Sequence, residues 1–248
     1  MQIKYNLDKI KFATDPPTLE RAIDLYENGK VTKFKEELNG YFATVLGTTP
    51  YNVYVFKTHF DRGECSCYLG QKEVLCKHMV AVAIHACLNG EPLKEKDKEI
   101  IDSPGCSDDL GELSKEELSV VKKDVTSAIR YVKGYTGPSR TWFAYQGSLN
   151  EGVRRLSKIV SELPIGLQTA KVLVDLLLRL DKKLCTGGVD DSNGTVGGFI
   201  QETVSVLEEY AKLDSNCIKS FDKLCEQKTC FEWEDPLVRI FDENDIDN

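Results

Sequence analysis

Residues 65–78 read Cys-Ser-Cys-Tyr-Leu-Gly-Gln-Lys-Glu-Val-Leu-Cys-Lys-His. The stretch contains two close pairs of soft metal ligands, Cys65/Cys67 and Cys76/His78, separated by a loop with Gly70 at its turn. Three thiolates and one imidazole complete a closed tetrahedral set, which is a donor set of structural zinc. We therefore predict that Cys65, Cys67, Cys76 and His78 bind one zinc ion and that the metal organises the residues around it.

The spacing within each pair allows both members to reach the same ion. Alternate residues of an extended segment point to the same side, so Cys65 and Cys67 can converge on one metal. His78 comes at the start of the apolar helical run 79–84, where its ring can face back toward the strand. We expect a strand to carry the first pair of ligands and the following helix to carry the second.

The order C-x-C and then C-x-H resembles the SWIM-type zinc finger. The residues that lead into the finger also resemble that family, over the segments 21–26, 29–31, 39–40 and 51–55 and at Gly47, so the likeness extends from residue 18 to residue 90. SWIM-type fingers are thought to bind DNA or protein partners, and they occur beside DNA-remodelling and recombination machinery. The resemblance therefore implies a zinc-dependent binding role.

The alternative is that the cysteines of this stretch are ordinary buried thiols, as free cysteines often are. Their neighbours are mostly charged, polar or glycine residues, which is a poor setting for core thiols. A disulfide between Cys65 and Cys67 would need strained geometry. The ligand set therefore favours metal.

The charge is spread unevenly along the 248 residues, a length that suits one large domain or two ordinary ones. Residues 1–100 hold 14 lysines and arginines and 14 aspartates and glutamates, whereas residues 101–248 hold 18 and 26, so the net charge of −8 belongs to the second half. An acidic second half argues against nucleic acid wrapping around the whole molecule.

The hydrophobic pattern changes period between the two halves. A helix over 18–28, strands over 31–37, 41–46 and 51–57, a hairpin turn at Asn39-Gly40 and a helix to about Leu88 are expected first. From Ser114, which forms a capping-box pattern with Glu117, the period is helical to the end, and the most apolar helix, 167–184, is expected to be the central one. We predict an α+β chain with a small sheet-and-helix zinc-finger domain (1–90), a linker (91–114) and an all-α helical bundle or short α-solenoid (115–248).

Four cysteines in the second half raise the question of another metal site. Cys185, Cys217, Cys225 and Cys230 form no close pair, and no histidine follows His85. Cys185, Cys217 and Cys225 lie beside helical apolar positions. We interpret them as buried thiols.

Catalysis finds little support in the sequence. The chain has three histidines, of which His78 is predicted to be a ligand and His85 is interpreted as a core residue. A closed zinc site leaves no position for a reactive water, and no phosphate-binding glycine loop is present. We expect no enzymatic activity and no small-molecule substrate. Nine cysteines without a secretory signal or a membrane-spanning run indicate a soluble protein of the cytoplasm, or of the nucleus in a eukaryote, with no membrane partner.

Basic residues around the finger suggest what it contacts. Lys57, Arg62, Lys72 and Lys77 are the candidate nucleic-acid ligands, although Asp61, Glu64 and Glu73 are interleaved with them and ordinary surface charge would explain the pattern as well. The first hypothesis is a non-catalytic adaptor that contacts nucleic acid, most readily DNA, through the finger. The alternative is a protein-interaction scaffold whose finger and acidic helical domain dock protein partners, and a zinc-supported enzyme is the third.

Overall fold

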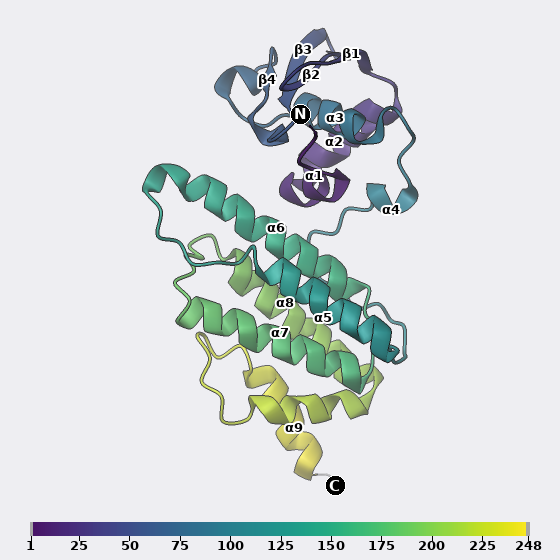
Figure 1. The fold of residues 1–248 in the computed structure, drawn as a ribbon. Helices are drawn as coiled ribbons and strands as arrows, with labels where there is room; N and C mark the ends of the chain where they lie inside the picture. The colour runs from purple at the N-terminus through teal and green to yellow at the C-terminus, as the bar shows by residue number, and fades with distance from the viewer. Residues whose placement is uncertain (1, 247–248) are drawn as a thin grey trace. The chain divides into compact units, whose positions relative to one another are not determined.

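The chain folds into two compact units, one ending at Ile100 and one beginning at Ile101. The computed structural model describes residues 2–246, and Figure 1 shows the sheet in the first unit and the long helices in the second. A small antiparallel sheet followed by a helical region confirms the predicted α+β class.

The sheet of the first unit has four antiparallel strands in the order β1-β2-β3-β4. They are β1 (Val31–Glu36), β2 (Gly40–Leu46), β3 (Pro50–Phe56) and the short β4 (Glu64–Cys65). The first three match the strands predicted from the alternating pattern, and the pairing of β2 with β3 runs from Gly40 opposite Phe56 to Leu46 opposite Pro50. The fourth strand carries Cys65, as expected of the strand that bears the first ligand pair, but its bounds were not predicted, because two residues are too few to show an alternating pattern.

Helix α3 (Lys77–Leu88) is the centre of the first unit, since it contacts both the sheet and helix α2 (Pro16–Glu27). Its residues 79–84 are almost completely buried between these two elements. The inner face of the sheet supplies Ala43, Val45, Val53 and Val55, which alternate with more exposed residues along β2 and β3. Helix α1 (Leu7–Ala13) adds Ile10 to the same core, and Asn89, in a left-handed conformation, ends α3 as expected.

Residues 91–114, which we expected to form a linker, are divided between the two units. The Tyr26 hydroxyl donates to the carbonyl of Glu91 (2.5 Å), and Lys98, at the end of the short helix α4 (Glu95–Lys98), pairs with Glu27 (2.6 Å). Beyond Ile100, the Ser107 hydroxyl donates to the carbonyl of Leu163 (2.6 Å). The segment up to Ile100 therefore completes the first unit, and the segment after it packs on the second.

The second unit is built from helices around one apolar core. The helices are α5 (Lys115–Ile129), α6 (Trp142–Ser161), α7 (Leu167–Cys185), α8 (Thr195–Leu213), the 3-10 helix η4 (Ser215–Leu224) and α9 (Asp235–Ile246). The predicted capping box forms at the start of α5, where the Ser114 hydroxyl accepts from the Glu117 amide and the Glu117 carboxylate accepts from the Ser114 amide. The core contains Leu149, Leu156, Leu173, Leu177, Phe199 and Tyr210.

Helix α7 is less buried than its composition suggested. Lys171, Asp175 and Arg179 recur every four residues along it and are exposed. The helix expected to be the central one therefore shows one stripe to solvent, as α8 does. Apolar content alone did not reveal that its polar residues share one face.

The interpretation of Cys185 as a buried thiol was also wrong. Cys185 ends α7, where the core-facing surface of the helix stops, and it is exposed and joined by a disulfide to Cys230, with the two Cα atoms 5.7 Å apart. Asp181 organises this region, because one of its carboxylate oxygens accepts from the Cys230 amide (2.8 Å) and from the Trp233 indole (3.0 Å). Cys217 is buried as predicted, and Cys225 is half-buried.

Among the described residues, no helix is long and apolar enough to cross a membrane.

Candidate metal centre

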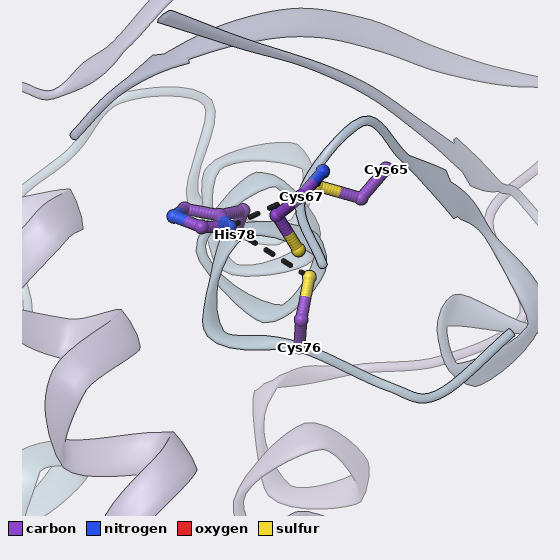
Figure 2. Close-up of side chains that lie close together, drawn as sticks. All are labelled: Cys65, Cys67, Cys76 and His78. Atoms are coloured by element: carbon purple, nitrogen blue, oxygen red, sulfur yellow. Dashed lines mark hydrogen bonds between the residues drawn. The ribbon is translucent and has the colours of Figure 1, made fainter. Parts of the chain in front are cut away.

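The four predicted ligands lie together at one end of α3 (Figure 2). Their ligand atoms all lie within 4.8 Å of one another, and all four residues are buried. Nδ1 of His78 is 3.8 Å from Sγ of Cys65 and 3.8 Å from Sγ of Cys76. Side chains separated by up to thirteen positions in the sequence thus converge on a single point.

This arrangement fits a zinc ion. Zinc bonds of about 2.3 Å to sulfur and about 2.0–2.1 Å to nitrogen place the ligand atoms of a tetrahedron roughly 3.5–3.8 Å apart. The distances from the two sulfurs to the imidazole nitrogen agree with that separation. Because the set already has four soft ligands, a bound zinc would have no open position, as in structural sites.

Strand β4 positions the first pair of ligands. Cys65 pairs with Val53 of β3, so its side chain lies on the buried face of the sheet with that of Val53. The amide of Ser66 donates to the carbonyl of Asn52 (3.0 Å), which keeps the chain extended to the next ligand. Cys67 therefore returns to the side of Cys65, as the one-residue spacing predicts.

Gly70 allows the loop after Cys67 to fold tightly against the first ligand. A Cβ atom at this position would lie 2.3 Å from the carbonyl oxygen of Cys65 and 2.5 Å from its Cβ, which is too close for any side chain. The Gly70 amide also donates to Sγ of Cys67 (3.3 Å). The close approach of these backbones explains why glycine stands at the turn.

The start of α3 positions the second pair and favours the thiolate form. Cys76 is the N-cap of the helix and His78 lies in its first turn. The pKa of Cys76 is lowered by hydrogen bonds to its thiolate from the Cys65 thiol, from His78 and from the Met79 amide, against the opposing effect of burial. The partial positive charge of a helix N-terminus acts in the same direction.

The two histidines of α3 have different surroundings. The ring of His78 stacks on that of Tyr51 at a centroid distance of 4.3 Å, which orients its Nδ1 toward the sulfurs. His85 instead packs against the rings of Phe34 (4.5 Å) and Tyr26 (5.7 Å), and burial lowers its pKa. The interpretation of His85 as a packed side chain and not a ligand agrees with this placement.

Lys57 does not belong to the predicted basic surface, because its side chain is buried. Its side chain is only 3% exposed, and its ammonium group pairs with Glu36 (2.6 Å) and lies 5.5 Å from the centre of the Tyr41 ring. Lys57 follows β3 at the same parity as Val53 and Val55, so the alternation that buries them also buries its stem. The alternation along β3 was therefore the sequence signal for the burial of Lys57.

The three other predicted basic residues remain accessible. Arg62 and Lys72 are exposed, and Lys77 is half-buried in the first turn of α3. The Lys72 ammonium donates to the Tyr68 hydroxyl (2.5 Å) and lies 4.2 Å from the centre of that ring. The carboxylates of Asp61, Glu64 and Glu73 are exposed among them, so the charge around the finger is mixed.

The sequence analysis missed part of an apolar surface on the same loop. We call residues 68–74 the finger loop, since they lie between the two ligand pairs. Tyr68 is 69% exposed, and Leu69 and Val74 are 42% and 48% exposed. The sequence signal for this surface was the presence of three large apolar residues within a seven-residue loop that the two ligand pairs hold at both ends.

Comparison with known protein families supports the same region. A family described as the SWIM zinc finger matches residues 51–87, from β3 to the last turn of α3, and this range includes all four ligands. The chain thus contains a SWIM-type zinc finger, and its Cys65, Cys67, Cys76 and His78 form a zinc-binding site. No curated protein and no solved structure matches the chain.

Proposed function

We propose that this protein is a non-catalytic adaptor whose SWIM finger docks a protein partner through the finger loop. The observation that carries the proposal is the exposure of Tyr68, Leu69 and Val74 on one short loop. Exposed apolar side chains that gather in one place mark interaction sites, and aromatic residues in particular supply much of the binding energy of protein interfaces.

A bound zinc ion would favour binding of a protein partner by ordering the finger loop. Cys67 precedes the loop and Cys76 follows it closely, so a metal bound by both would hold its two ends. A loop that is already ordered loses less conformational entropy when a partner binds. The closed ligand set is suited to this structural role and not to activating water.

The charges near the loop favour a protein over a polyanion. With Lys57 buried against Glu36, three of the four predicted basic residues remain, and exposed carboxylates lie among them. A phosphate backbone would meet these carboxylates as well as the cations. A protein surface can offer both signs of charge around an apolar centre.

The test compares two triple variants of the full-length protein in affinity capture from its native cells. The first carries Tyr68→Ser, Leu69→Ser and Val74→Ser. The second carries Leu38→Ser, Phe143→Ser and Leu213→Ser, which remove apolar side chains elsewhere that are at least as exposed. Native mass spectrometry first verifies that both retain zinc. Each captured protein is then purified and its dissociation constant measured by calorimetry.

We expect the finger-loop variant to weaken binding by at least about tenfold and the control variant to bind as the wild type does. Capture should survive nuclease treatment. Partners that bind both variants equally would contradict the proposal, as would partners that nuclease removes.

DNA contact is the second candidate, and it is favoured by the free cations of the finger. Within the described part of the chain, Arg62, Lys72 and Lys77 form no ion pair with a carboxylate. They could neutralise phosphates but offer no recognition helix for base readout. Such binding would be weak, little dependent on sequence and strongly dependent on salt.

A further inference from the structure

The second unit carries a cationic groove on an otherwise acidic surface. The groove lies between α5 and α7, has a volume of about 620 Å³ and is mostly apolar in its lining. Its apolar residues are Val125 of α5 and Val172, Leu176 and Leu178 of α7, and its cations are Lys122, Arg179, Lys182 and Lys223. The groove therefore combines an apolar floor with a positive rim.

The positive charge extends along α5. A second hollow shares Lys122 and Thr126 with the groove and adds Lys115, Lys123 and Arg130. Together the two hollows are lined by seven lysine and arginine side chains and only two carboxylates, Asp124 and Asp175, the second of which pairs with Lys223. The half of the chain that contains them has 18 cationic and 26 anionic side chains, so this concentration of one sign runs against the charge of its own domain.

The cations are available to a ligand. Among the described residues, Lys122, Lys182 and the three added by the second hollow have no carboxylate partner. Arg179 donates to the Thr126 hydroxyl (3.3 Å), which turns its guanidinium toward α5. Like charges held close together repel one another, so an anionic ligand would relieve this repulsion as well as form new pairs.

We propose that the groove between α5 and α7 binds an acidic amphipathic helix of a partner protein. A helix laid along such a groove places its apolar side chains on the floor and its flanking carboxylates against the rim. This inference does not depend on what the finger binds.

Nucleic acid fits this groove less well. Surfaces that bind single strands combine cations with aromatic side chains on which bases stack, and none of the described residues that line the two hollows is aromatic. An extended single strand of nucleic acid would also run beyond the groove and meet the acidic remainder of the second unit. A short helix would remain within the cationic region.

The test uses the full-length protein and a labelled synthetic helix of about 18 residues, long enough to span roughly 27 Å. The peptide carries leucine at helical spacing on one face and glutamate on both flanks. A peptide of the same composition with the leucine positions scrambled keeps the charge and loses the apolar face. A labelled DNA single strand is the competing polyanion, and binding is followed by fluorescence anisotropy.

Two double variants separate groove contacts from general charge. Lys122→Glu with Arg179→Glu reverses two rim cations, and Lys133→Glu with Lys212→Glu makes the same change in net charge at exposed positions outside the groove. Leu178→Ala shortens an apolar side chain of the floor. Leu178 is only partly buried, so its truncation should disturb the core little. Circular dichroism verifies that each variant is folded.

We expect saturable binding of the patterned peptide, and about tenfold weaker binding by the rim variant than by its matched control. Leu178→Ala should weaken binding severalfold, and the scrambled peptide should bind less tightly than the patterned one. Absence of saturable binding up to about 1 mM peptide would overturn the proposal. Equal affinity for the two peptides, tighter binding of the DNA strand, or equal effects of the two double variants would also overturn it. Light scattering tests for self-association through the groove. A dimer that the rim variant abolishes would overturn the proposal as well.

Discussion

At the scale of single residues, the four ligands should act as a unit. Cys76→Ser replaces a thiolate that is the N-cap of α3 and whose pKa is lowered by its neighbours, leaving only three soft ligands. Binding of structural zinc is worth about 10–16 kcal/mol in small fingers, so losing one of four ligands removes much of it. We expect one zinc per wild-type chain and none in the variant by native mass spectrometry.

Cys87→Ser is the matched control for this substitution. Cys87 belongs to the same helix and is half-buried, but it lies outside the ligand cluster. The control should retain its zinc. Wild-type protein that binds no zinc, or equal zinc content in the two variants, would contradict the assignment.

The four zinc ligands could be predicted because their spacing in the sequence shows that they can reach one metal ion. Cysteines two positions apart in an extended segment and a histidine at a helix start can converge whatever the details of the fold. The role of Lys57 was not predicted, because its partner Glu36 belongs to β1, which β2 separates from β3 in the sheet and which comes 21 positions earlier in the sequence. A charge pattern read along the chain does not show which charges the sheet brings together.

At the scale of secondary-structure elements, removing zinc should release the finger and spare the rest of the first unit. Residues 60–78 have two short 3-10 turns and one two-residue strand, so the metal replaces the regular hydrogen bonding they lack. Helix α3 beyond His78 packs on the sheet and α2 and should remain protected. Hydrogen exchange with and without a chelator should show lost protection over residues 60–78 and little change in α7 and α8. Equal loss of protection in both units would be the contrary result.

A disulfide that joins the end of α7 to the loop before α9 should stabilise the second unit. Cys185 and Cys230 are separated by 45 positions, and closing a loop of that size restricts the unfolded chain. Reduction should lower the free energy of unfolding by roughly 2–4 kcal/mol. Chemical denaturation followed by the fluorescence of Trp233, which contacts Asp181 beside the disulfide, measures this change.

The double variant Cys185→Ser with Cys230→Ser provides the control for this effect. It should match the reduced wild-type protein and should not respond to reductant. A response of the variant equal to that of the wild type would assign the effect to the other cysteines, including the zinc ligands.

Helical periodicity identified most elements of the second unit but not all of their properties. Ile218, Phe221 and Leu224 recur every three residues, and this is the period of the 3-10 helix η4 that the structure shows. The contact between Cys185 and Cys230 could not be predicted, since it depends on the path of the loop after η4. Local patterns give the element and its buried face, whereas tertiary contacts decide which distant residues meet.

At the scale of the whole molecule, the uneven charge bears on the DNA candidate. The first unit has equal numbers of cationic and anionic residues, and the remainder of the chain carries the full net charge of −8. Repulsion between that acidic remainder and DNA is long-ranged at low salt and screened within about 10 Å at 0.1 M. If the finger binds DNA through Arg62, Lys72 and Lys77, the second unit should oppose it.

We therefore expect the fragment 1–100 to bind DNA more tightly than the full chain. The fragment ends at Ile100 because the contacts of Glu91 with Tyr26 and of Lys98 with Glu27 hold the segment after α3 to the first unit. Anisotropy titrations over a range of salt concentrations should show the largest difference at low salt. With three cations available, the affinity for duplex DNA should fall with a log-log slope of about 3 or less.

Lys72→Glu with Lys77→Glu should abolish this binding, because it reverses two of the three cations of the finger. Lys4→Glu with Lys94→Glu makes the same change in net charge at exposed positions outside the finger and should weaken binding less. Both variants should retain zinc, since none of the four lysines is a ligand. Equal binding by fragment and full chain would contradict the expected repulsion by the acidic unit. If neither binds, or if the two variants behave alike, the cations of the finger do not form a phosphate-binding site and protein docking through the finger loop becomes its remaining role.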